Sequence, residues 1–308
     1  MDKPVVEVSI IIVNWNTREF LKGCLDSIYK TTRNLTYEVC VVDNASGDGS
    51  AQMVEKEFLQ VKLIKNRHNV GDGAAINQGI KVSKGTVILL LNSDVVVLDG
   101  CIEKMLALIH DNPEMGALCA QSLYPDGRIQ FCCRRFPILK TVLFDDTFLG
   151  RWFPQNRVMQ KYLYRDWPHN DSRQVEQPPI TCFMIRREVI KVVGLLDSNF
   201  FIYFNDPDWC YRIKKAGFKI FFTTQAKVIH YGEESVKKNK DRYYHWHKDR
   251  IYYYRKHFGL YSVFLIKFIL LSDFSERLIK LLIKRILNLA QGRDIVEHLN
   301  LYFRIMVT

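Results

Sequence analysis

The sequence predicts an α/β fold, with one open, doubly wound and mainly parallel sheet followed by a C-terminal helical extension. In the first 120 residues, short apolar runs alternate with patterns suited to helices. We expect strands at 8–14, 38–43, 61–65 and 86–92, and helices at 17–30, 48–58 and 73–82. The strand runs are apolar almost throughout rather than at alternate positions, which indicates burial on both faces, as in a parallel sheet.

The middle of the chain is less regular. Residues 124–177 are rich in aromatic residues, Arg and Pro and show no sustained period, so we expect loops and short elements above the sheet. Beyond them we expect strands at 180–185, 219–223 and 228–230, and helices from 187 and over 207–216. Pro207 in the first turn and Gly217 just past the end mark the second of these helices.

The last quarter of the chain is basic, aromatic and amphipathic. Residues 234–308 hold 15 Lys plus Arg against 7 Asp plus Glu, and so carry 8 of the 11 net positive charges. Apolar runs at 260–271 and 278–289 are shorter than the roughly 20 residues of a membrane-spanning helix. We therefore divide the chain into a main domain at 1–233 and an extension at 234–308 whose helices lie on an anionic membrane surface. Packing on the main domain or a homo-oligomer interface is the alternative.

Composition excludes several classes of protein. With 308 residues, 48% of them hydrophobic, the chain can bury a substantial core. Its eight cysteines form no CxxC or zinc spacing and no regular disulfide framework, which favours a reducing compartment. The N-terminal residues lack the basic and apolar segments of a signal peptide, so we expect a cytoplasmic protein. Basic and aromatic residues together would also suit nucleic acid, but no recognised nucleic-acid-binding motif accompanies them.

Polar side chains stand at the ends of three predicted strands, which is where open α/β sheets bind ligands. Asn14 ends the first strand, Asp43 ends the second, and Asn92 and Asp94 follow the most apolar one. Asp43 suits hydrogen bonds to a nucleobase or ribose, and equally suits a turn or helix cap. The Asp94 carboxylate, held by a buried strand, suits a divalent cation that bridges a diphosphate.

Three further features are candidates for a site. Around Gly71, small residues open a helix and expose backbone amides suited to phosphate, although tight packing explains the same residues. Asp206 and Asp208 start a helix after a run of aromatic residues, where one of them suits a general base and either suits a helix cap. His230 closes an apolar strand, where a lone histidine is more often a core or surface residue than a ligand.

A set of short motifs occurs in a fixed order along the chain. The motifs are SIIIVNWN at 9–16, VVDNAS at 41–46, NVG at 69–71, NQG at 77–79, LNSD at 91–94, FIYFNDPD at 201–208 and VIH at 228–230. Together they resemble the inverting family 2 glycosyltransferases, and in particular the bacterial rhamnosyltransferase-like branch, over residues 5–232. The segments DGR at 126–128 and RRFP at 134–137 are also typical of that branch.

The resemblance implies a glycosyltransferase A-type fold for 1–233 that binds a nucleoside-diphosphate sugar with Mg²⁺ or Mn²⁺. It assigns Asp43 to the nucleobase, and both Asp94 and His230 to the metal. Asp206 would deprotonate the acceptor hydroxyl, with Asp208 as the runner-up. The residues expected to bind the nucleotide sugar are Asn14, Asn16, Asp43, Asn69, Gly71, Asn77, Asn92 and Asp94.

The sequence departs from the family pattern at three places. Val96 stands where many relatives carry a second acid, so His230 and diphosphate oxygens must complete the metal shell. Asn205 replaces the usual Glu before the expected base, which alters the acceptor geometry or the pKa of Asp206. The residues TCF at 181–183 replace a more common small pair, which narrows the acceptor side of the site.

We therefore expect an inverting glycosyltransferase that is peripheral on the cytoplasmic face of the membrane. Its donor is a nucleoside-diphosphate sugar, with dTDP-rhamnose as the working choice, and its acceptor is lipid-linked or a cell-surface polysaccharide. A catalytically silent sugar-nucleotide-binding relative is one alternative, against which the presence of Asp206 argues. A nucleotide-cofactor oxidoreductase is another, but NWNT at 14–17 stands where its glycine fingerprint would follow the first strand.

Overall fold

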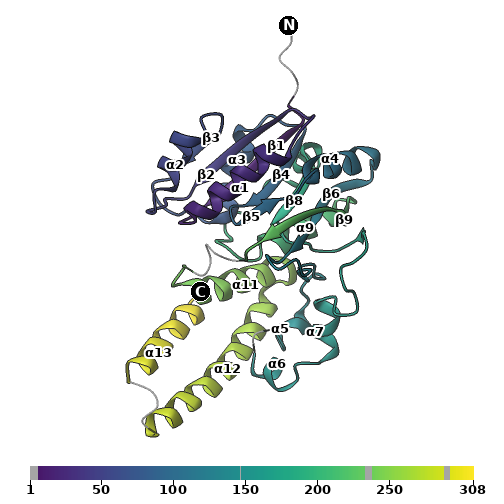
Figure 1. The fold of residues 1–308 in the computed structure, drawn as a ribbon. Helices are drawn as coiled ribbons and strands as arrows, with labels where there is room; N and C mark the ends of the chain where they lie inside the picture. Colours follow the sequence, from purple (N-terminus) through teal and green to yellow (C-terminus); the bar gives the residue numbers. More distant parts are fainter. Residues whose placement is uncertain (1–5, 146, 233–237, 288–291) are drawn as a thin grey trace. The chain divides into compact units, whose positions relative to one another are not determined.

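A single mixed sheet organises the first of two units in this computed structural model, which describes residues 6–145, 147–232, 238–287 and 292–308 (Figure 1). The first unit comprises Met1–Arg135 and Trp167–Lys240. Along the sheet the strand order is β3-β2-β1-β4-β8-β6-β9-β5, and β7 pairs with β9. The strands are β1 (Val8–Asn14), β2 (Tyr37–Asp43), β3 (Lys62–Lys65), β4 (Val87–Asn92), β5 (Val95–Val97), β6 (Met115–Leu123), β7 (Arg173–Gln174), β8 (Cys182–Arg186) and β9 (Lys219–His230).

The sheet is parallel in its first half and mixed in its second. Strands β1 to β4 run parallel, and their register sets Asn14 opposite Asp43 and Val13 opposite Asn92. The carboxyl ends of β1, β2 and β4 therefore meet at one edge. In the second half, β8 is antiparallel to both β4 and β6, and β9 is parallel to β6. The short strand β5 is antiparallel to β9, which brings a residue from early in the chain beside His230.

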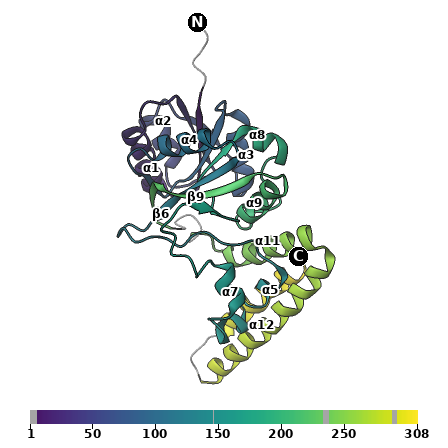
Figure 2. The same cartoon turned by 90° about the vertical axis from the view of Figure 1, so that its right-hand side faces the viewer.

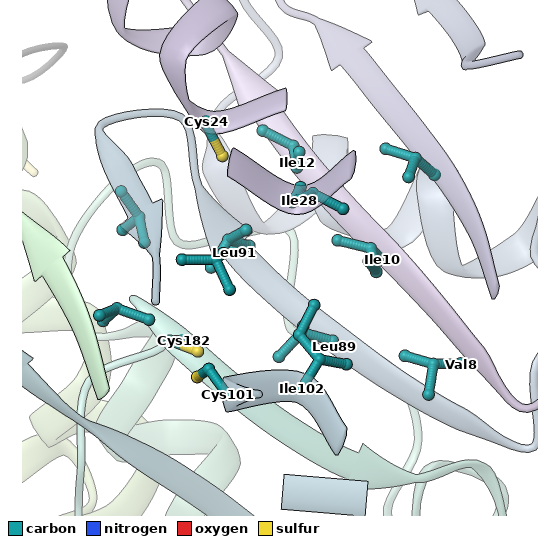
Figure 3. Packing of buried hydrophobic residues seen from close by; sticks show 14 of the residues in the cluster. Val8, Ile10, Ile12, Cys24, Ile28, Leu89, Leu91, Cys101, Ile102 and Cys182 are labelled. Atoms are coloured by element: carbon teal, nitrogen blue, oxygen red, sulfur yellow. The ribbon is translucent and has the colours of Figure 1, made fainter. Parts of the chain in front are cut away.

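Helices cover both faces of this sheet (Figure 2). They are α1 (Arg18–Thr31), α2 (Ser50–Glu57), α3 (Asp72–Val82), α4 (Cys101–Asp111), α8 (Arg187–Val193) and α9 (Asn205–Lys215). On one face, Ile10 and Leu89 of the sheet pack with Ile28 of α1 and Ile102 of α4 in the main apolar core (Figure 3). On the other face α3 packs directly against β1. Glycine at position 79 of α3 permits this close packing, because a Cβ there would overlap the side chain of Ile11.

The second unit comprises Phe136–Asp166 and Asp241–Thr308. Its helices are α5 (Leu139–Val142), α6 (Phe148–Trp152), α7 (Arg157–Tyr162), α11 (Arg242–Phe258), α12 (Leu260–Ile286) and α13 (Gly292–Met306). Arg151 of α6 contacts both Asp273 and Glu276 of α12 at 2.8 Å, and the hydroxyls of Thr141 and Tyr254 lie 2.7 Å apart. The segment Phe136–Asp166, which we grouped with the main domain from its sequence, thus belongs to the unit of the C-terminal helices.

Helix α12 continues through the first of the two C-terminal apolar runs and most of the second. It spans 27 residues, and aromatic side chains such as Tyr261, Phe264 and Phe268 are mostly exposed on it. Lys and Arg side chains interrupt its apolar sequence. Within the described ranges of the chain, no helix is both long enough and apolar enough to cross a membrane.

Candidate active site

A pocket of about 230 Å³ opens in the first unit where β1 and β4 end and where α3 and α9 begin. Three carboxylates line it, from Asp72, Asp94 and Asp206. The remaining lining residues are Val13, Trp15, Asn44, Asn69, Asn92, Ser93, Ile180, Thr181, Ile202 and Tyr203. The pocket lies at the carboxyl edge of the parallel strands, which is where the sequence predicts the site.

Asp94 lies in the tight connection between β4 and β5. The strand before it is buried from Val87 to Leu91, and Asp94 itself is only 5% exposed. The main chain at this point is held on both sides, because the Asn92 N–H donates to the Thr181 carbonyl and the Tyr231 N–H donates to the Asp94 carbonyl. The carboxylate is therefore presented by a rigid backbone, as its position after a buried strand predicts.

His230 lies beside Asp94. The pairing of β5 with β9 sets Val95 opposite His230, and the His230 Nε2 lies 3.4 Å from the Asp94 Oδ1. This Nε2 is buried and makes no hydrogen bond with any residue in the described part of the chain. The other ring nitrogen, Nδ1, lies 3.0 Å from the Gln130 Oε1. The structure thus brings together the two residues that we expected to share a metal.

Asp206 lies in the first turn of α9 and faces the pocket. Its Oδ2 accepts a hydrogen bond from the Ile180 N–H at 3.3 Å. Burial raises the pKa of Asp206 to about 6, an effect that this hydrogen bond and the charge of Arg134 partly offset. A carboxylate with this pKa is ionised at neutral pH and yet is a stronger base than an ordinary aspartate.

Asp72 is a third carboxylate that the sequence analysis did not single out. It begins α3, and its N–H donates to the Phe201 carbonyl at 2.6 Å. Burial and the nearby charge of Asp206 raise the pKa of Asp72 to about 7. Near neutral pH the pocket therefore holds an ionised Asp206 and an Asp72 that is partly protonated.

Asp208, the runner-up for the general base, is separated from the pocket. It is fully buried, and its Oδ2 accepts a 2.9 Å hydrogen bond from the Arg212 Nε one helical turn later. The ion pair ties α9 to the segment before it, because Arg212 also donates to the carbonyls of Val193 and Leu195. The geometry favours Asp206 over Asp208 as the residue that faces a ligand.

Asn14 and Asp43 form a buried pair at the ends of β1 and β2. The Asn14 Nδ2 donates to the Asp43 Oδ1 and to the Ser46 Oγ, both at 3.0 Å. Asn16 accepts a 2.7 Å hydrogen bond from the Gly47 N–H and so holds the same turn. None of Asn14, Asn16 and Asp43 lines the pocket. Their contacts with a nucleotide stay predictions, and the observed role of Asn14 is to orient Asp43.

Gly71 and Asn77 make close contacts with the segment that leads to α9, and their contacts with a nucleotide sugar stay predictions. A Cβ at Gly71 would lie 2.7 Å from the Phe201 carbonyl oxygen, and its φ of +86° also favours glycine. Asn77 uses both ends of its amide on the main chain of Leu196, with bonds of 2.8 and 3.1 Å. These residues hold the start of α3 against the segment that leads to Asp206.

Other residues of the pocket were not predicted individually. The Asn44 Nδ2 donates to the Asn69 Oδ1 at 2.8 Å, so Asn44 links the end of β2 to the expected ligand residue Asn69. The one signal for Asp72 was its place in a glycine-rich helix start. Trp15 and Tyr203 belong to motifs that we recognised, yet the pattern alone does not tell which way their rings face.

Two protein side chains at this site could bind a metal ion. Among the residues described, no three His, Cys, Asp or Glu side chains are grouped closely enough to hold a metal ion. Asp94 offers a carboxylate oxygen, and His230 offers a ring nitrogen that makes no hydrogen bond within the described residues. Both donor types suit a divalent cation. The donor set fits Mn²⁺ or Mg²⁺ provided that a bound ligand supplies the remaining oxygens.

Comparison with known sequences supports the interpretation. A profile described as "Glycosyl transferase family 2" matches residues 9–194. An N-acetylglucosaminyl-diphospho-decaprenol L-rhamnosyltransferase of Mycobacterium tuberculosis is 26% identical over 239 residues, which cover 74% of this chain and 76% of that protein. The O-antigen biosynthesis protein RfbC of Myxococcus xanthus is 25% identical over 240 residues, which cover 76% of this chain. The matched region is only 18% of RfbC, so this chain corresponds to a small part of that relative.

Comparison with solved structures concerns the fold. The structure of GalNAc-T7 with UDP, GalNAc and Mn²⁺ superposes with a TM-score of 0.53 at 18% sequence identity. The superposition covers 74% of this chain and 44% of that one. Together with the sequence profile, this likeness confirms the glycosyltransferase A-type fold.

Proposed function

The chain belongs to glycosyl transferase family 2, in its rhamnosyltransferase-like branch, and from this premise we propose that it transfers a sugar from a nucleoside diphosphate to an acceptor hydroxyl with inversion. One observation carries the proposal. The Asp206 carboxylate and the Asp94 carboxylate line the same pocket at the carboxyl edge of the sheet. A single displacement needs two such groups, one to activate the nucleophile and one to serve the leaving diphosphate.

We assign the general base to Asp206. As the acceptor oxygen forms its bond to the anomeric carbon, Asp206 takes the hydroxyl proton, and the bond from that carbon to the diphosphate breaks. A raised pKa of about 6 suits this task, because the base is ionised at neutral pH and still binds the proton well. The Ile180 N–H fixes the orientation of the carboxylate through Oδ2. One displacement from the face opposite the leaving group inverts the anomeric configuration.

Asp94 and His230 are the residues that would hold Mg²⁺ or Mn²⁺, which when bound would offset the charge on the departing diphosphate. The fit rests on the buried Nε2 of His230, which lies close to the Asp94 carboxylate. A pocket lined by three carboxylates would otherwise repel an anionic donor. The donor's diphosphate oxygens would complete the shell, since Val96 offers no oxygen.

The donor and acceptor follow from the kind of relatives. We propose a nucleoside-diphosphate sugar, with dTDP-rhamnose as the first to test, because one relative carries the name of a rhamnosyltransferase. We propose a lipid-linked or cell-surface polysaccharide acceptor, since the relatives' names refer to a diphospho-decaprenol substrate and to O-antigen biosynthesis. Our candidates for the nucleotide side of the site remain Asn14, Asn16, Asp43, Asn69, Gly71, Asn77 and Asn92. The proposed donor and acceptor give nucleic acid no role as a partner.

The second unit is our candidate for contact with the cytoplasmic face of a membrane. Tyr261, Phe264 and Phe268 of α12 are 71%, 73% and 69% exposed. Large apolar side chains this exposed, next to Lys267 and in the most basic part of the chain, suit an anionic lipid surface. A homo-oligomer would cover the same side chains and is the alternative.

Two measurements test the proposed function. UDP, dTDP or GDP with Mn²⁺ should raise the melting temperature of the protein, whereas NAD should not. Stabilisation by NAD alone would favour the oxidoreductase. A screen of nucleotide sugars should then give a product whose anomeric configuration, read by NMR, is inverted. Retention would contradict the single displacement, and binding without any turnover would favour the catalytically silent alternative.

A further inference from the structure

Gln130 holds both the ring and the main chain of His230. Its Nε2 donates to the His230 carbonyl oxygen at 2.6 Å, and its Oε1 lies 3.0 Å from the His230 Nδ1. Gln130 is itself only 8% exposed. The amide nitrogen makes one contact and the amide oxygen makes the other, so a rotation of the amide group would break both.

A tight turn delivers Gln130 to this position. Residues 124–128 reverse the chain after β6, with hydrogen bonds from the Tyr124 N–H to the Arg128 carbonyl and from the Gly127 N–H to the Tyr124 carbonyl. Gly127 has a φ of +85°, a conformation that favours glycine. The Gln130 N–H then donates to the Ser122 carbonyl at 2.9 Å, on the strand that lies parallel to β9. The DGR motif thus has a structural purpose, which is to bring Gln130 to the end of β9.

The hydrogen bonds determine which nitrogen of His230 carries the proton. A main-chain carbonyl only accepts, so the amide nitrogen of Gln130 must face the His230 carbonyl. Its amide oxygen must then face Nδ1, and because that oxygen only accepts, Nδ1 must carry the hydrogen. In the neutral ring, Nε2 is left with a lone pair, and this is the buried atom that lies 3.4 Å from the Asp94 carboxylate.

We propose that Gln130 is a positioning residue of the metal site, which holds His230 in the tautomer whose Nε2 can bind a cation beside Asp94. In the other tautomer, Nε2–H would donate to Asp94 and neither group would be available as a ligand. A ring lone pair and a carboxylate oxygen repel one another unless a proton or a metal cation lies between them. Gln130 therefore keeps the pair open for a cation. The inference rests on the proposed function, in which these two residues hold the metal.

The test compares three variants with the wild type by Mn²⁺ electron paramagnetic resonance. Each protein is titrated with Mn²⁺ in the presence of whichever of UDP, dTDP and GDP stabilises the wild type most. Gln130→Leu should weaken Mn²⁺ binding about 10- to 100-fold, the usual effect of losing an outer partner of a histidine ligand. Gln130→Glu keeps an acceptor for Nδ1–H but loses the donor to the His230 carbonyl, so it should bind Mn²⁺ more weakly than the wild type and more tightly than Gln130→Leu.

Gln121→Leu is the matched control. Gln121 is a buried residue of β6 whose Nε2 donates to the His169 carbonyl at 2.7 Å, so the variant loses a similar amide-to-carbonyl bond without touching His230. Its Mn²⁺ affinity should equal that of the wild type. Equal Mn²⁺ affinity in Gln130→Leu and wild type, or an equal loss in Gln130→Leu and Gln121→Leu, would overturn the proposal.

A second readout does not depend on the metal. Nitrogen-15 NMR of histidine-labelled, metal-free protein reports the tautomer of His230, whose signals are those missing from His230→Ala. We expect Nδ1–H in the wild type and a shift toward Nε2–H in Gln130→Leu. Nε2–H in the wild type would overturn the inference about Gln130, even if the protein binds Mn²⁺. The proposed metal centre would then be unaffected. A wild type with Nδ1–H that binds no Mn²⁺ with any of the three nucleotides would instead overturn the proposed metal centre, and with it this role of Gln130.

Discussion

The Nε2 of His230 lies 3.4 Å from the Oδ1 of Asp94, although the two residues are far apart in the chain. The pairing of β5 with β9 creates this relationship, since it sets the residue after Asp94 directly opposite His230. A site with two protein ligands leaves most of a cation's shell open, so the bound donor must contribute to it. Metal and nucleotide binding should therefore depend on each other.

Mn²⁺ should bind weakly to the empty protein and at least about tenfold more tightly in the presence of nucleoside diphosphate, a difference of about 1.4 kcal/mol or more. His230→Ala should remove much of this gain. Val96→Asp should tighten Mn²⁺ binding to the empty protein, because it adds a second carboxylate two residues after Asp94. Isothermal titration with and without nucleotide measures all three, and a nucleotide-independent affinity in the wild type would contradict the shared site.

Replacement of the proposed base should separate chemistry from binding. Asp206→Asn should lower kcat about 10²- to 10⁴-fold, because the proton acceptor is lost. Nucleotide affinity should stay close to that of the wild type. Asp208→Asn should instead lower stability by roughly 3 kcal/mol, because it breaks the buried pair with Arg212. Steady-state kinetics and thermal melts distinguish the two variants, and full turnover by Asp206→Asn would remove the mechanism.

Asp72 should make the folded protein less stable as pH rises. Its pKa is raised from 3.8 to about 7, so between these values the folded state binds more protons than the unfolded state, and the stability from Asp72 is lost across this window. Asp72→Asn should thus be more stable than the wild type at pH 8, by about 1–2 kcal/mol for this partly exposed group, and equal to it near pH 4. Thermal melts across this range provide the measurement. A constant difference at all pH values would show that the amide acts by packing alone.

The same site shows where prediction from the sequence ends. The apolar runs before Asp43 and Asp94 are local patterns, and so their strands and the edge at which they end could be predicted. Asp72 could not, because its surroundings depend on a contact with Phe201 that no local pattern reveals. The pairing of Arg151 with Asp273 is equally remote in the chain, and no local pattern around Arg151 indicates it.

Gln130 and Asn77 show a second reason why parts of the site could not be predicted from the sequence. Asn77 lies within the NQG motif and Gln130 lies two residues after DGR. Both are buried amides, yet Gln130 contacts a histidine ring and Asn77 contacts a main-chain segment. A motif identifies the residue type that a family requires at a position, but the partner of its side chain is set by long-range packing. Roles such as orienting a ligand residue or fixing a tautomer become visible only in three dimensions.

Contact of α12 with a membrane can be tested without disturbing the fold. Phe264 and Phe268 are 73% and 69% exposed, so replacing both by Ser should leave the melting temperature unchanged. Each phenylalanine buried in lipid contributes about 1.5–3 kcal/mol, and so the double variant should lose most of its co-sedimentation with anionic vesicles. Leu59→Ser, at an 84% exposed position of the first unit, is the control and should bind as the wild type does. If vesicle binding persists while a wild-type oligomer dissociates in the double variant, this face is an interface between copies of the chain.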